Sequence, residues 1–118
     1  MRVRDYHNDP GIRFWVPEPP QGYQPLGPEV REGGHRIAFW ARVVDGHLED
    51  VRFTASRRCR KLLALADVVA ERLRGQPYRA CSWDPAAVLA TFADERDQGK
   101  LRARLDLIRR ALRCTSAA

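Results

Sequence analysis

The sequence predicts a small α+β fold, in which three helices pack on a small antiparallel sheet. Two observations favour this fold. Apolar residues alternate on both sides of a two-residue turn between residues 37 and 53, which indicates a β-hairpin. Three later segments show the apolar stripes of helices that pack on a core. A hairpin followed by helices in one short chain is typical of an α+β domain.

The hairpin is the clearest local signal in the chain. Ile37, Phe39 and later residues alternate with neighbours that are also largely apolar. Asp45-Gly46 is a favoured two-residue turn, because glycine tolerates a positive φ and aspartate adopts one at modest cost. A second strand continues through Leu48 to Phe53. The sequence therefore predicts two paired strands joined at Asp45-Gly46.

A long helix is expected over about residues 57–74, with Ser56 as its N-cap. Gly75 and Pro77 should end it. Its apolar positions recur at helical spacing and predict a well-buried helix. They are Leu62, Ala66, Val69 and Leu73, with Leu63, Leu65 and Ala70 beside them.

Two further helices are predicted after the long one. Asp84-Pro85 supplies an N-cap and a proline at the first helical position, which begins a short helix that runs through Phe92. Gly99 then interrupts the chain before a last helix. The apolar stripe of that helix is formed by Leu101, Leu105, Ile108 and Leu112.

The first 35 residues are expected to form an irregular arm, since they hold six of the eight prolines and five of the eight glycines. Both residue types disfavour regular helix and central strand. The same stretch contains aromatic residues, which a disordered tail rarely holds. They are Tyr6, Phe14, Trp15 and Tyr23. We therefore divide the chain into an arm, residues 1–35, that packs on a body, residues 36–118.

Length and composition exclude several protein classes. The 118 residues suit one domain, and 44% hydrophobic with 31% charged residues is the composition of a soluble globular protein. No apolar run approaches the roughly 18 residues that a membrane span needs. Arg2, Arg4 and Asp5 stand where a secretory signal would become apolar. We therefore expect a cytoplasmic protein without a membrane segment.

The three cysteines indicate a reducing compartment, because Cys59, Cys81 and Cys114 are odd in number and far apart in the sequence. Neither Cys81 nor Cys114 has a partner at metal-ligand spacing. The chain contains no P-loop, GxGxxG, GxSxG, HExxH or EF-hand motif. The sequence therefore predicts reduced thiols and a protein that is not an enzyme.

Cys59 is the candidate functional residue, because it falls in the expected first turn of the long helix among cationic side chains. A helix N-terminus and nearby cations both stabilise a thiolate, the form that binds metals and reacts with electrophiles. A free cysteine is more commonly a small buried apolar residue, and that alternative stays open.

A basic cluster lies around Cys59 in a chain of net charge +6, whose other cations are spread along the sequence. Its side chains are candidate contacts for an acidic protein partner, and a nucleic acid is the less favoured alternative because basic and aromatic residues are not interleaved. The cluster consists of Arg57, Arg58, Arg60 and Lys61.

The whole chain resembles the iron–sulfur cluster scaffold proteins of the NifU N-terminal/IscU type. The segment YHNDPG at residues 6–11 is similar to the opening pattern of that family, and DGHLEDVRF at residues 45–53 is similar to its hairpin. A cysteine at the start of a long helix, here Cys59, and a Gly75-Gln76 step at its end also match. The resemblance implies the same α+β fold.

The cluster ligands of the family are mostly missing. The first cysteine motif of the family falls on residues 33–35, so only His35 offers a ligand there. Its third cysteine falls near Gly99-Lys100, and its chaperone-binding tag is missing from residues 93–100. A [2Fe–2S] cluster needs four ligands, mostly thiolates. The resemblance therefore leaves Cys59 and His35 as candidate ligands.

Three functions remain open at this point. The first is an accessory or adaptor protein of iron–sulfur or metallocentre biogenesis. It would bind a partner protein, either a metalloenzyme or an iron–sulfur assembly component, and hold no cofactor as a monomer. The second is an altered scaffold that binds a cluster, iron or zinc through Cys59, His35 and a ligand from Cys81, Cys114 or a second subunit. The third is a basic nucleic-acid-binding module.

Overall fold

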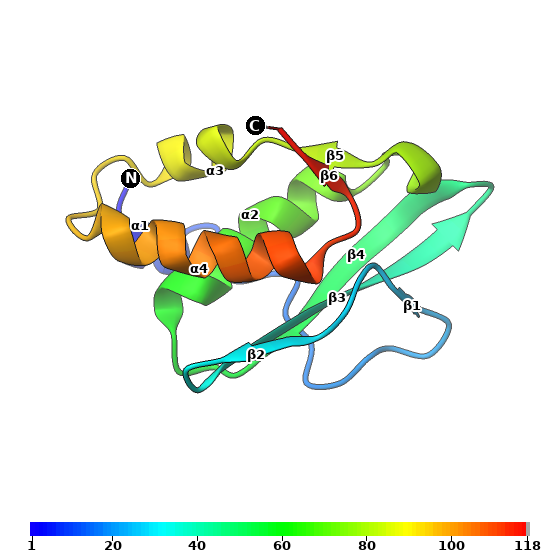
Figure 1. The fold of residues 1–118 in the computed structure, drawn as a ribbon, viewed down its shortest axis with the longest axis horizontal. Helices are drawn as coiled ribbons and strands as arrows, with labels where there is room; N and C mark the ends of the chain where they lie inside the picture. The colour runs from blue at the N-terminus through cyan, green and yellow to red at the C-terminus, as the bar shows by residue number, and fades with distance from the viewer. Residues whose placement is uncertain (118) are drawn as a thin grey trace.

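An antiparallel sheet forms one layer of the molecule, and the helices lie on one side of it (Figure 1). The computed structural model describes residues 1–117. The long strand β3 (His35–Val44) pairs along its length with β4 (His47–Ala55). Two short strands, β1 (Gln24–Pro25) and β2 (Val30–Glu32), pair with its other edge. The predicted α+β fold with a small antiparallel sheet is confirmed.

The predicted hairpin is present and turns where the sequence indicates. Asp45 and Gly46 connect β3 to β4 and have φ angles of 51° and 75°. Both angles are positive, as a two-residue hairpin turn of this type requires. Phe39 and Phe53 are directly paired across the two strands, and both side chains are fully buried. The inner face of the hairpin therefore packs against the hydrophobic core.

Within residues 1–117 four α-helices lie over the sheet, one more than the sequence predicts. The three expected helices are α2 (Arg60–Leu73), α3 (Pro85–Thr91) and α4 (Gln98–Ala111), and α1 (Val3–Asn8) is the additional one. A 3-10 turn η1 (Tyr78–Ala80) follows α2, and the short strands β5 (Ser82–Trp83) and β6 (Thr115–Ser116) pair in parallel. No helix within residues 1–117 is long and apolar enough to cross a membrane.

The core lies between the sheet and the two long helices, because α2 packs against β4 and α4 packs against β3. The predicted stripe of α2 faces this core throughout. Its members Leu62, Ala66, Val69 and Leu73 each have a relative exposure of 0%.

Both long helices begin slightly away from the predicted positions. The N-cap of α2 is Cys59 rather than Ser56, since its sulfur accepts the backbone N–H of Leu62 at 3.5 Å. In α4 the carboxylate of Asp97 accepts the N–H of Lys100, so the helix begins before Gly99 and includes it. A local capping contact therefore determines where each of the two helices begins.

The arm contains a helix where the sequence predicts irregular structure. The carboxylate of Asp5 accepts the backbone N–H of Arg2, which caps the first turn of α1. Val3 and Tyr6 point into the core and are 4% exposed. This helix forms because tertiary contacts stabilise it, although it has only six residues.

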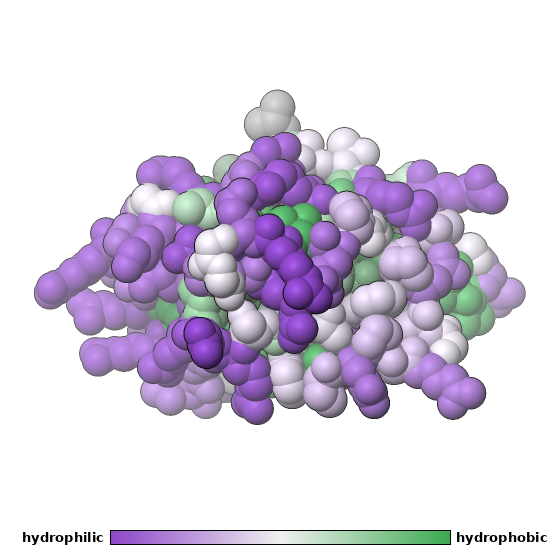
Figure 2. Space-filling model, turned by 60° about the horizontal axis from the view of Figure 1, so that its bottom comes forward, coloured by the Kyte–Doolittle hydropathy of each residue, from purple (hydrophilic) through white to green (hydrophobic). Residues whose placement is uncertain are grey.

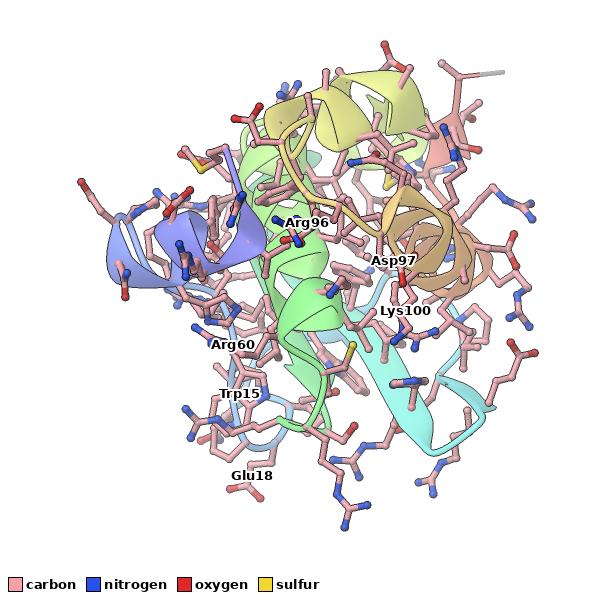
Figure 3. The ribbon with its side chains drawn as sticks, turned by 90° about the vertical axis from the view of Figure 1, so that its left-hand side faces the viewer. Trp15, Glu18, Arg60, Arg96, Asp97 and Lys100 are labelled. Carbon is pink, nitrogen blue, oxygen red and sulfur yellow. A yellow bond between two sulfur atoms is a disulfide. The ribbon has the colours of Figure 1, made fainter. Side chains whose placement is uncertain are left out.

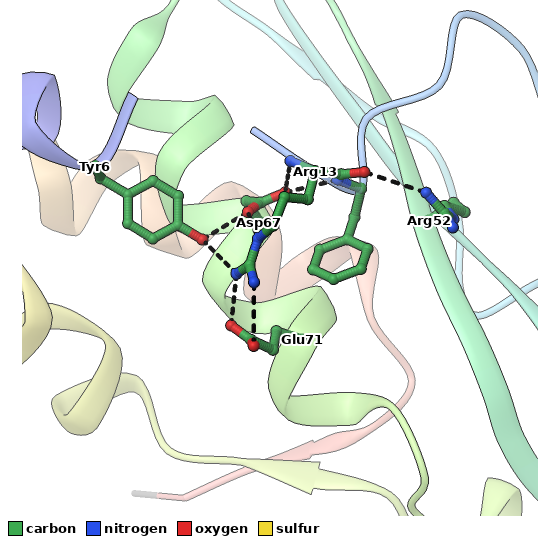
Figure 4. Close-up of polar contacts among 6 residues, drawn as sticks. Tyr6, Arg13, Arg52, Asp67 and Glu71 are labelled. Carbon is green, nitrogen blue, oxygen red and sulfur yellow. Dashed lines mark hydrogen bonds and ion pairs between the residues drawn. The ribbon is translucent and has the colours of Figure 1, made fainter. Parts of the chain in front are cut away.

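A buried carboxylate on α2 fastens the arm to the body (Figure 4). Asp67 is fully buried and accepts the backbone N–H groups of Arg13 and Phe14, each at 2.8 Å. Its other oxygen accepts the hydroxyl of Tyr6 at 2.5 Å. Arg13 also pairs with Glu71, with 2.6 Å between Nη2 and Oε2. Residues 1–14 are therefore held on α2 by charge-assisted hydrogen bonds.

Cys81 and Cys114 form a disulfide, so the prediction of reduced thiols is wrong for these two residues. Their Cα atoms lie 4.9 Å apart, within the range that a disulfide spans. The pairing of β5 with β6, in which Ser82 lies opposite Thr115, brings them together. The sequence does not indicate this pairing, because the two strands are short and far apart in the chain.

The outer surface is mainly hydrophilic on the side brought forward in Figure 2, where hydrophobic side chains form only small separate spots. Among the residues that the structure describes, the exposed large hydrophobic side chains are those of Met1 and Val44. A partner is therefore expected to recognise charge on this molecule rather than a large apolar surface.

Candidate functional site

A cavity of about 380 Å³ lies at one end of the molecule, where α1 and the first turns of α2 and α4 meet. Seven of the ten residues that line it are cationic, and we call it the basic cavity. Arg2 and Arg4 come from the start of α1, Arg58, Arg60 and Lys61 from the start of α2, and Lys100 and Arg104 from α4. Figure 3 views this end and shows Arg60 beside α2 and Lys100 at the start of α4.

The positive charge of the basic cavity is not neutralised by nearby carboxylates. The ion pairs found within residues 1–117 all involve other cations, such as Arg13, Arg42 and Arg52. Glu95 is the one acidic residue in the lining, and one of its oxygens accepts the backbone N–H of Val3 at 3.0 Å. The cavity therefore has a large excess of positive charge.

Helix orientation adds to this charge. The helices α2 and α4 each have 14 residues, and residues of the first turn of each line the basic cavity. The N-terminus of a helix carries a partial positive charge from its aligned peptide dipoles. The dipole of α2 therefore adds to the side-chain charges at this place, and the potential attracts anions. The carboxylate of Asp97, which caps α4, offsets the dipole of that helix.

Cys59 lies in the wall of the basic cavity, half-buried and free of any disulfide. Its sulfur is contacted by two donors: the N–H of Leu62 at 3.5 Å and the Nε–H of Arg104 at 3.4 Å. Arg104 comes from the second turn of a different helix, 45 residues further along the chain. Cys59 is therefore one component of a cationic site rather than an isolated thiol.

His35 begins β3 and lines a separate cavity of about 340 Å³ at the turn of residues 31–36. Burial lowers the pKa of His35, and the positive charge of Arg104 lowers it further. Its Nδ1 is buried and has no hydrogen-bond partner within the described part of the chain. The structure thus brings both predicted ligands near Arg104 but places them in different cavities.

The two predicted ligands, Cys59 and His35, do not by themselves complete a [2Fe–2S] or zinc site. Cys59 and His35 supply two donors, and Cys81 and Cys114 are bonded to each other. Within residues 1–117 no group of three or more His, Cys, Asp or Glu side chains is placed to hold a metal. Zinc and [2Fe–2S] sites need three or four protein ligands. The guanidinium of Arg104 also repels a metal cation at Cys59.

The predicted basic cluster is divided between two environments. Arg58, Arg60 and Lys61 line the basic cavity, but Arg57 stacks on the ring of Trp15, with its guanidinium carbon 4.6 Å from the ring centroid. The remaining cavity cations were not predicted as site residues, because they come from parts of the sequence remote from Cys59. They are Arg2, Arg4, Lys100 and Arg104.

Comparison with known proteins identifies no relative of this chain. No model of a known protein family matches the chain, and no curated protein matches it. The likeness to the NifU/IscU family therefore rests on the sequence motifs quoted above, chiefly residues 45–53 and Cys59.

Proposed function

We propose that this protein is an accessory or adaptor protein of iron–sulfur or metallocentre biogenesis, which docks on an acidic partner protein through the surface around Cys59. The observation that supports docking is the basic cavity, whose seven cations form no ion pair within the described residues. Complementary charge accelerates association and selects partners. An unneutralised basic surface therefore suits an acidic partner.

The pathway is supported by the sequence resemblance. Residues 45–53 form the turn and most of the second strand of the hairpin. Cys59 follows at the start of a long helix, in the order that the resemblance leads us to expect. The donor set supports an adaptor over a scaffold, because Cys59 and His35 leave at least one ligand to be supplied by another chain. A binding role without catalysis agrees with the lack of catalytic motifs.

Reconstitution with iron and sulfide tests the adaptor role against the scaffold alternative. Protein purified without oxygen should contain little iron or acid-labile sulfide, and reconstitution should leave both substoichiometric. A stoichiometric, chelator-resistant cluster that is lost in Cys59→Ala would contradict the adaptor role and favour the scaffold.

Docking is tested by titration of the chain against purified iron–sulfur assembly proteins from the same organism. One of them should bind with an affinity that falls as salt rises, because salt screens charge. Arg60→Gln should weaken that binding about tenfold, a single-charge contribution of about 1.4 kcal/mol. Arg102→Gln is the matched control, since Arg102 is exposed on α4 and does not line the basic cavity. Tighter, salt-sensitive binding to a single-stranded oligonucleotide would instead favour a nucleic-acid-binding module.

A further inference from the structure

We infer that the basic cavity is a binding site for a small anion that carries two or more phosphate groups. The inference concerns the free protein and goes beyond the adaptor role, because it requires no partner chain. The cavity presents seven cationic side chains and one acidic side chain within about 380 Å³. A singly charged anion leaves most of these cations without a counter-charge, whereas a diphosphate or triphosphate pairs with several of them at once.

Burial strengthens the attraction at three of these side chains. Arg2, Lys61 and Arg104 are only partly exposed, and none of them has an ion-pair partner within residues 1–117. A cation that is partly removed from water interacts more strongly with a nearby anion, because the local dielectric constant is lower. The structure therefore holds desolvated positive charge that a bound anion stabilises.

The geometry of the donors favours phosphate. Five of the seven cations are arginines, and the planar guanidinium fork matches two oxygens of one phosphate. The N-terminal end of α2, which reaches the cavity, is suited to phosphate for the same electrostatic reason, whereas the N-terminus of α4 is already capped by the carboxylate of Asp97. The lining draws its donors from two helices, with Arg58 and Arg60 at the start of α2 and Lys100 and Arg104 on α4.

The lining also indicates which part of a ligand is recognised. A volume of about 380 Å³ is at the lower end of the range for small-molecule sites. None of the ten lining residues is aromatic, so the described cavity offers no ring on which a nucleobase would stack. The cavity therefore suits a compact polyphosphate group rather than a nucleoside.

Calorimetric titration of the full chain with pyrophosphate and tripolyphosphate tests this inference, and citrate serves as a carboxylate probe of comparable charge. Tripolyphosphate should bind at least tenfold more tightly than citrate, with an affinity that decreases as salt rises. Arg104→Gln and Lys100→Gln should each weaken binding about tenfold. Arg102→Gln removes the same charge from the same helix outside the cavity and should change the affinity less than twofold.

Several results would overturn the inference. No detectable binding of either phosphate probe would do so, as would equal affinities for citrate and tripolyphosphate. Equal weakening by Lys100→Gln and Arg102→Gln would show a diffuse effect of net charge rather than a site. Lys100→Gln is the decisive variant if Arg104→Gln unfolds, because the Lys100 side chain is exposed whereas Arg104 contacts Cys59. Circular dichroism checks the fold of each variant. These titrations contain no partner protein, so their failure is distinguishable from a failure of the docking proposal.

Discussion

The hydroxyl of Tyr6 and the carboxylate of Asp67 lie 2.5 Å apart, so a residue of α1 is hydrogen-bonded to a fully buried charge on α2. Burial raises the pKa of Tyr6, and the hydrogen bond to Asp67 raises it further. The Tyr6 hydroxyl therefore stays protonated, and remains a donor, above the pH at which an exposed tyrosine ionises. The same carboxylate accepts two backbone N–H groups of the arm, so it organises the whole N-terminal segment.

Asp67→Asn should destabilise the protein by about 3 kcal/mol, because it leaves the donors of Tyr6 and Arg13 facing a group that accepts fewer hydrogen bonds. Tyr6→Phe removes one hydroxyl only and should cost about 2 kcal/mol. Urea unfolding measures both values. An Asp67→Asn variant that is less destabilised than Tyr6→Phe would contradict the central role of the carboxylate.

Acid should destabilise the protein partly through Asp50, which is 5% exposed on β4. Burial by itself raises the pKa of its carboxyl, but hydrogen bonds from Tyr23 and Arg52 and the charge of Arg74 lower it below its ordinary value. A lowered pKa in the folded state contributes stability above the unfolded-state pKa of about 3.9. That contribution is lost as the pH falls through the folded-state value.

Unfolding by urea between about pH 6 and pH 2 measures this dependence. Asp50→Asn should be less stable than the wild type near neutral pH, and its stability should change less on acidification. Glu71 and Asp106 also have lowered pKa values, through Arg13 and Arg109 respectively, so some acid sensitivity should remain. If the free energy of unfolding falls equally with pH in Asp50→Asn and in the wild type, Asp50 does not contribute to the acid sensitivity.

Reduction of the Cys81–Cys114 disulfide should lower the free energy of unfolding by about 3 to 4 kcal/mol, as the two cysteines are 33 residues apart and their bond restricts the unfolded chain. Thermal melts with and without a thiol reductant measure the effect. Cys59→Ser should keep this sensitivity, because Cys59 is free. A double Cys81→Ser, Cys114→Ser variant should melt identically in both conditions. A wild-type melt that the reductant leaves unchanged would contradict a disulfide in the folded protein.

Truncation of a buried side chain in the apolar stripe of α2 should lower the free energy of unfolding. Leu73→Ala should destabilise the protein by about 3 kcal/mol, since its side chain is fully buried and the neighbouring residues refill the space only in part. Val44→Ala is the control, because Val44 is 42% exposed at the end of β3 and should change stability by less than about 0.5 kcal/mol. Similar losses for the two variants would contradict the predicted orientation of α2.

The hairpin and the buried face of α2 could be predicted because their signals are local. Asp45-Gly46 requires only the conformational preferences of two residues, and the stripe of α2 needs only helical periodicity. The helix α1 could not be predicted in this way. Its six residues gain their stability from the contact of Tyr6 with Asp67, which is 61 positions away.

The candidate site was predicted only in part for the same reason. One part of the site could be predicted because its residues are adjacent in the sequence, namely Cys59 with Arg58, Arg60 and Lys61. Lys100 and Arg104 look like solvent-facing residues of an ordinary helix until packing places α4 beside α2. The disulfide could not be predicted, because three cysteines do not indicate which two of them pair.

The Cys81–Cys114 bond closes a covalent ring that contains all of α3 and α4. Lys100 and Arg104 of the basic cavity belong to this ring, whereas Arg60 and Lys61 belong to α2 outside it. The disulfide lies beyond the C-terminal end of α4 and joins that end to the segment that follows α2. The part of the chain that carries Lys100 and Arg104 is therefore covalently closed, although the bond itself lies outside the cavity lining.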